Sequence, residues 1–97
     1  MAYRITRYTF DQAKKLGVEV KPSKISGKKI DVFKKGEKVA SVGAIGYNDY
    51  PTFMRLEREG KVPKGTAVTR RKAYKQRHEK DRHVRGSAGY YADKLLW

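Results

Sequence analysis

One stretch of this sequence, residues 64–85, combines a helix signal with a very high positive charge. It reads KGTAVTRRKAYKQRHEKDRHVR and carries nine Lys and Arg residues against one Glu and one Asp, a net +7. Gly65 and Thr66 offer a helix start, Gly86 offers a stop, and good helix formers lie between them. A helix with cations on nearly every face cannot build a hydrophobic core. We therefore expect a helix over about residues 66–85 that either lies on an anionic partner or is a solvated face held by the rest of the chain.

The whole composition favours an anionic partner. Of the 97 residues, 24 are Lys or Arg and 10 are Asp or Glu, which gives a formal net charge of +14. Such an excess points to nucleic acid first and to an anionic membrane surface second. The chain has no cysteine and two histidines, so we expect no disulfide, no metal site and no cofactor. No apolar run approaches the ~20 residues that span a bilayer, and no signal-peptide pattern is seen, so we expect no membrane span and no secretion.

Alternating residues in the middle of the chain predict a β-hairpin. Residues 29–33 (KIDVF) and 38–42 (KVASV) alternate, and Gly36 lies in the short turn between them. We expect Ile30 and Val32 to face one way, with Val39 across from them. Two strands alone are marginal, so a helix or a third strand should cover the apolar face.

The remaining elements are expected to be short helices. Gly17 should end the first, Pro51 suits the first turn of the second, and Gly60 should stop it. The expected N-caps are Thr9 or Asp11 for the first helix, Asn48 or Asp49 for the second, and Ser87 for a last helix over about 87–96. The sequence thus predicts one small α+β domain over residues 1–97, a hairpin with or without a third strand packed with three to four short helices.

The cations of the basic stretch are the candidate binding residues. Guanidinium and ammonium groups in this arrangement would neutralise phosphates, and nothing indicates a set that reads base edges. The expected phosphate-binding residues are Arg70, Arg71, Lys72, Lys75, Arg77, Lys80, Arg82 and Arg85, supported by Lys28 and Lys29 from a basic loop. The alternative is a solvated helix stabilised by the internal pairs Lys75–Glu79 and Arg77–Asp81.

Two aromatic groups have open roles. Tyr47, Tyr50 and Phe53 lie beside glycines and could stack on single-stranded bases, although a place in the core is the favoured interpretation. The apolar end of the sequence should dock on the chain's own core or on a partner. Its candidate partner-docking residues are Tyr90, Tyr91, Leu95, Leu96 and Trp97.

No pattern in the sequence predicts catalysis. His78 and His83 lie five residues apart and so do not share a helix face. Glu79 and Asp81 are surrounded by cations, which favours their ionised forms and makes them poor general acids. No nucleophile–His–acid set and no phosphate-loop motif is present. We therefore expect a protein that is not an enzyme.

Four segments, AKKLGVEVKPS, KKIDVFKKGEKVASVGA, GYNDYPTF and RRKAYKQRHEKDRHVRGSAGYYADKLLW, together cover most of the chain. In these segments the sequence resembles a family of small basic proteins of unknown function encoded by large DNA viruses of algae and amoebae and by related environmental viruses. Residues 56–64 match less clearly. The resemblance implies a viral origin and a virion component, and it transfers no catalytic residue.

These observations predict a virus-encoded, non-enzymatic, basic structural protein that binds nucleic acid through phosphate contacts. It would be found in the virion or in the cytoplasm or nucleus of the infected cell. One alternative is a minor capsid or cement protein, which would dock on coat protein through residues 1–10 and 90–97 and match an acidic capsid surface with its charge. A second alternative is an accessory subunit of a viral nucleic-acid enzyme. The choice between DNA and RNA, the strandedness and the oligomeric state stay open.

Overall fold

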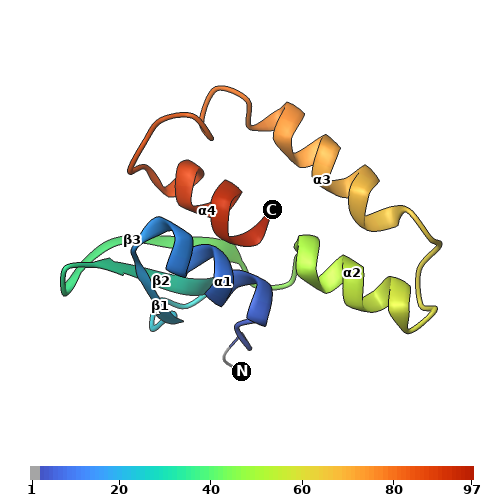
Figure 1. Ribbon diagram of the computed structural model, residues 1–97, viewed down its shortest axis with the longest axis horizontal. Helices are drawn as coiled ribbons and strands as arrows, with labels where there is room; N and C mark the ends of the chain where they lie inside the picture. The colour runs from blue at the N-terminus through green and yellow to red at the C-terminus, as the bar shows by residue number, and fades with distance from the viewer. Residues whose placement is uncertain (1–2) are drawn as a thin grey trace.

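A three-stranded antiparallel sheet in the order β1-β2-β3 is the base of the fold (Figure 1). The computed structural model describes residues 3–97 and places β1 at Glu19–Pro22, β2 at Lys28–Lys34 and β3 at Glu37–Ala44. Lys35 and Gly36 form the two-residue β2–β3 turn with φ of 53° and 81°, the backbone that suits the twist of a hairpin. The predicted hairpin is confirmed, and β1 supplies the third strand.

The expected position of Val39 is wrong because β3 contains a bulge. Ile30 lies opposite Val42 and Val32 opposite Ala40, but the register then shifts, which leaves Val39 as an extra residue. A bulge turns the extra side chain away from the paired face. The side chain of Val39 is accordingly exposed.

Four helices complete an α+β fold, as expected from the sequence. They are α1 (Arg7–Leu16), α2 (Tyr50–Arg58), α3 (Thr66–Arg77) and α4 (Ala88–Leu96). Asp49 and Ser87 cap α2 and α4 as predicted, since their side chains accept from the backbone N–H groups three residues later. The cap of α1 is Thr6 rather than Thr9 or Asp11.

The basic helix is shorter than predicted. It ends at Arg77 instead of near residue 85, and residues 78–87 form a series of turns that lead back to α4. Gly89 permits this return, because a Cβ atom there would lie 2.9 Å from the Cβ of Asp81. Close contact with α4 thus overrides the local helix preference of the segment.

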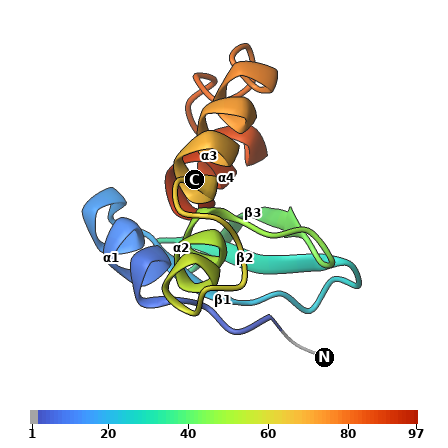
Figure 2. The same ribbon diagram turned by 90° about the vertical axis from the view of Figure 1, so that its right-hand side faces the viewer.

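The core lies between one face of the sheet and the two helices α1 and α4. Ile30, Val32 and Val42 from the sheet meet Leu95 and Leu96 from α4, and all five are at most 2% exposed. Helices α2 and α3 pack on each other beside this core, and α3 and α4 stand above the sheet (Figures 1 and 2). The core is therefore built without the cationic face of α3.

Gly43 allows β3 and α4 to approach closely. Its φ is 82°, and a Cβ atom there would lie 2.8 Å from Cδ1 of Leu96 and 2.9 Å from Cδ of Lys29. Gly36 has a similar φ of 81° but nothing within 4 Å of its Cβ position. An alanine at Gly36 would therefore cause backbone strain alone, whereas an alanine at Gly43 would cause strain and steric overlap.

We predict that Gly43→Ala lowers the free energy of unfolding by about 3 kcal/mol, of which about 1 kcal/mol is backbone strain and the rest overlap with the core. Gly36→Ala should lower the free energy of unfolding only by the backbone strain, about 1 kcal/mol. Urea unfolding of both variants measures the difference, and equal losses would show that the α4 contact imposes no steric demand at Gly43.

A buried carboxylate also ties the sheet together. Asp31 in β2 is 4% exposed and accepts hydrogen bonds from the hydroxyls of Ser23 and Ser41, each at 2.6 Å. Burial alone would raise the pKa of Asp31, but these bonds, a backbone N–H of Lys24 and the charge of Lys38 together hold it below its usual value. The ionised carboxylate is therefore part of the folded sheet.

We predict that Ser41→Ala destabilises the fold by about 2 kcal/mol at pH 7 and by progressively less as the pH falls below 3.8 and through the folded pKa of Asp31. The reason is linkage. A folded pKa below the ordinary 3.8 stabilises the fold above that pH, and the contribution is lost as the pH falls through the folded pKa. Urea unfolding across this pH range measures the effect, and the exposed Ser26→Ala serves as control. A penalty independent of pH would argue against an ionised Asp31.

Candidate nucleic-acid interface

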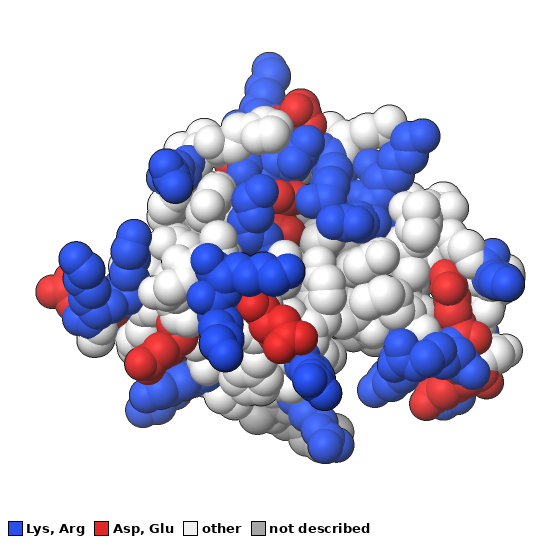
Figure 3. Space-filling model, in the orientation of Figure 1, with Lys and Arg blue, Asp and Glu red and all other residues white. Residues whose placement is uncertain are grey.

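Positive charge alone does not mark a site on this protein. Figure 3 shows Lys and Arg side chains spread over nearly every element of one face, with Asp and Glu side chains between them. The position and the partners of each cation therefore decide whether it can bind an external anion.

Two of the predicted phosphate-binding residues are directed to a buried carboxylate. Nζ of Lys75 lies 2.7 Å from Oδ1 of Asp93, and Nη1 of Arg82 lies 3.8 Å from Oδ2. Asp93 is 1% exposed, so its charge requires such partners. The expected pairs Lys75–Glu79 and Arg77–Asp81 are not formed within residues 3–97.

Glu79 pairs with the turn that follows α3. It accepts from the Arg82 guanidinium at 2.9 Å and contacts the His83 ring at 2.8 Å. The hydrogen bonds from His83 and Arg82 lower the pKa of Glu79 below its ordinary value. This agrees with the expectation that Glu79 stays ionised.

Two more of the predicted residues are engaged within the fold. Arg71 donates through Nε to a main-chain oxygen of Trp97 at 2.6 Å, and its guanidinium lies 4.8 Å from the ring centre of Tyr50. Lys29 is 4% exposed and donates to Asp49 at 3.1 Å and to the main-chain oxygen of Tyr47. The expectation that Lys29 contacts phosphate is therefore wrong, because its ammonium group is buried and paired.

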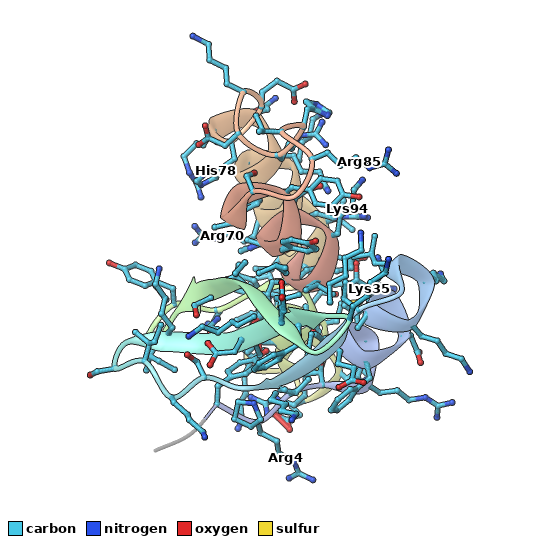
Figure 4. The ribbon with its side chains drawn as sticks, turned by 90° about the vertical axis from the view of Figure 1, so that its left-hand side faces the viewer. Arg4, Lys35, Arg70, His78, Arg85 and Lys94 are labelled. Carbon is cyan, nitrogen blue, oxygen red and sulfur yellow. The ribbon has the colours of Figure 1, made fainter. Side chains whose placement is uncertain are left out.

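The remaining predicted cations are exposed, and none has an ion-pair partner in the described part of the chain. They are Lys28, Arg70, Lys72, Arg77, Lys80 and Arg85. They do not share one face. Figure 4 shows Arg70 and His78 on one side of α3 and α4, and Arg85 on the other side with Lys35 and Lys94. Arg85 borders a separate hollow with Lys15 and Lys34.

Three of these exposed cations line one groove. Lys28, Arg70 and Arg77 border a hollow of about 420 Å³ between the β3–α2 loop, α3 and the end of α4. The guanidinium carbon of Arg70 lies 5.8 Å from the ring centre of Phe53 at its wall. Among the residues that the structure describes, no Asp or Glu side chain lines this groove. The lining is therefore cationic and aromatic, which suits an anionic ligand with flat, apolar groups.

A ladder of stacked rings runs along the groove. The ring centres of His78 and Tyr74 lie 4.3 Å apart, and those of Tyr74 and Trp97 lie 4.4 Å apart with only 8° between the planes. Phe53 follows at 6.4 Å from Trp97. Burial, with the charge of Asp93 adding to it, raises the pKa of Tyr74 to about 12, so its phenol stays neutral. The ladder fixes α3 against α4 and α2.

The expectation that Tyr47 packs in the core is wrong. Tyr47 is 75% exposed at the mouth of the groove. Tyr50 and Phe53, from the same cluster, are half-buried. The signal for an exposed Tyr47 is the pair of glycines that precede it, Gly43 and Gly46, which indicate a bend or loop rather than a packed element.

The candidate partner-docking residues lie largely in the core. Tyr91, Leu95 and Leu96 are at most 5% exposed, and Tyr90 and Trp97 are half-buried. In addition, the hydroxyl of Thr9 donates to the main-chain oxygen of Leu95 at 2.8 Å. The end of α4 thus docks on the chain's own core, and Met1 and Ala2, from the other proposed docking end, lie outside the described residues.

Comparison of the chain with protein-family models, with curated proteins and with solved structures finds no match. None of the helices within residues 3–97 has the length and apolar character needed to cross a bilayer. Over the same range, no three His, Asp or Glu side chains gather closely enough to hold a metal ion.

Adjacent lysines provide a test of this division between structural and exposed cations. We predict that Lys29→Met lowers the free energy of unfolding by about 3 kcal/mol, because it leaves Asp49 buried without its cation. Lys28→Met, which removes the same charge from an exposed position, should change it by less than about 0.5 kcal/mol. Urea unfolding compares the two, and a stable Lys29→Met variant with weakened nucleic-acid binding would instead make Lys29 a phosphate ligand.

Proposed function

We propose that this protein binds nucleic acid, and that the groove bordered by Lys28, Arg70 and Arg77 is its main contact. The observation that supports this most is the described lining of the groove, which combines exposed, unpaired cations with aromatic rings and contains no Asp or Glu side chain. An anionic polymer that carries flat rings fits both features. The protein acts as a non-enzymatic, basic structural component.

The mechanism is neutralisation of phosphates with release of their counterions. Arg70 and Arg77 lie seven residues apart, which places them on the same side of α3 two turns apart. Two cations in this arrangement can meet two phosphates of the same backbone, while Lys28 approaches from the sheet. Binding of this kind depends strongly on salt and little on sequence.

The resemblance to small viral proteins supports a viral origin and a role in the virion or in the infected cell. A minor capsid protein that docks through its apolar end is less well supported, because Leu95 and Leu96 are part of the core. An acidic coat-protein surface would have to meet the same exposed cations as nucleic acid. Removing the end of α4 would unfold the chain and so cannot distinguish the two.

We predict that Arg70→Gln/Arg77→Gln reduces the slope of log K against log salt by about 1.4 to 1.8, since each lost phosphate contact removes about 0.7 to 0.9. Fluorescence anisotropy of labelled single-stranded and duplex 30-mers across a salt series measures this slope. The control is Lys14→Gln/Lys35→Gln, which removes the same charge from exposed positions away from the groove.

The two double variants carry equal net charge, so net charge cannot explain a difference between them. Equal slopes for both would place binding outside the groove. Absent binding of the unmodified protein to either 30-mer near physiological salt would overturn the proposed function.

A further inference from the structure

We infer that the groove receives an unstacked base of a single strand, so that the protein prefers single-stranded nucleic acid to duplex. This inference rests on the proposed function and gives the aromatic residues of the groove a role in binding. Tyr47, Trp97 and Phe53 contact the base, and Arg70, Arg77 and Lys28 hold the flanking phosphates.

Tyr47 is the residue that the fold itself does not explain. Its ring is 75% exposed, the most exposed large apolar side chain in the described chain. Its backbone, however, is held in place. The buried Lys29 donates to its main-chain oxygen, and Asp49 two residues later caps α2 and binds Lys29 at 3.1 Å. A ring presented on a fixed backbone loses little freedom when it stacks on a ligand.

The wall opposite the β3–α2 loop is equally well fixed. The Tyr74–Trp97 stack and the neighbouring Phe53 close the groove toward the core, and Arg71 holds the main chain of Trp97. The volume of about 420 Å³ lies in the range of sites for small organic ligands. A flat apolar ring therefore fits between Tyr47 and this wall.

The arrangement favours a single strand for a physical reason. Bases in a duplex are stacked and paired, so a duplex can offer this site only its phosphates. A single strand can turn a base out of its own stack, and base–aromatic stacking then adds to the phosphate contacts without regard to sequence. The rim of the groove contributes to binding of both forms, whereas its interior contributes to one.

A path for the strand continues past Tyr47. A second hollow, of about 650 Å³, also borders this loop and shares Lys29, Tyr47 and Asn48 with the groove. The exposed Arg4 and Arg55 border it, and no carboxylate lines it. In Figure 4, Arg4 lies below the sheet and Arg70 above it. Since Tyr47 and Asn48 border both hollows, the β3–α2 loop connects these two cationic surfaces. A strand that crosses this loop passes over the exposed ring.

The test compares Tyr47→Ala with the unmodified protein on a labelled dT 12-mer and on a duplex 12-mer across a salt series. We expect Tyr47→Ala to weaken single-strand binding about tenfold and duplex binding less than twofold. Its salt slope should not change, because no charge is removed. Tyr47→Trp should restore binding, and Phe10→Ala, which removes another half-exposed ring from α1, should have no effect.

Trp97 is the chain's single tryptophan and provides a second readout. We expect the dT 12-mer to change its fluorescence emission strongly, and inorganic polyphosphate, which has no bases, to bind without that change. An unaltered single-strand to duplex ratio in Tyr47→Ala would overturn this inference and leave the proposed function standing. No binding of any polyanion by the unmodified protein would overturn both, and tighter binding of polyglutamate than of the 12-mer would assign the groove to an acidic protein.

Discussion

The burial of Asp93 is the constraint on which the basic half of the molecule depends. Asp93 lies in the C-terminal half of α4 and is 1% exposed. A buried charge without partners would lower the free energy of unfolding by several kcal/mol. Lys75 from α3 and Arg82 from the following turn supply those partners. Helix α3 has no continuous apolar stripe. The Lys75–Asp93 ion pair and the Tyr74–Trp97 stack therefore attach α3 to the core. The helix therefore ends where its chain must turn back to bring Arg82 to Asp93.

The same principle organises the opposite side of the groove. Lys29 is buried against Asp49, and this pair fixes the loop that presents Tyr47. Some cations of the chain thus pair with buried carboxylates and link elements of the fold, whereas the cations without such a partner remain on the surface. A net charge of +14 says how strongly the protein attracts a polyanion. The distribution of buried carboxylates decides which cations stay exposed, and therefore where the proposed polyanion would be held.

Local features of the sequence predicted local features of the fold. The hairpin turn at Gly36, the caps at Asp49 and Ser87, and the α+β class were all predicted, because each depends on residues close together in the chain. The partner of Lys29 is 20 residues away and that of Lys75 is 18 residues away. Nothing near Lys28 and Lys29 in the sequence tells them apart, yet one is exposed and the other is structural. The bulge at Val39 and the end of α3 also depend on contacts across the fold.

Trp97 and Tyr47 show why core and site must be distinguished in such a small protein. The indole of Trp97 lines the groove and also packs between α2, α3 and α4. If its removal abolished binding, the cause could be either a lost contact with the ligand or a groove that no longer forms. Tyr47 touches the groove without supporting the core, so its ring can be changed while the cationic rim stays in place. Under the proposed function, affinity follows from the rim and its phosphate contacts, whereas the inferred preference for a single strand follows from one exposed ring. In a chain of 97 residues the two properties can be altered separately because the β3–α2 loop, rather than the core, carries that ring.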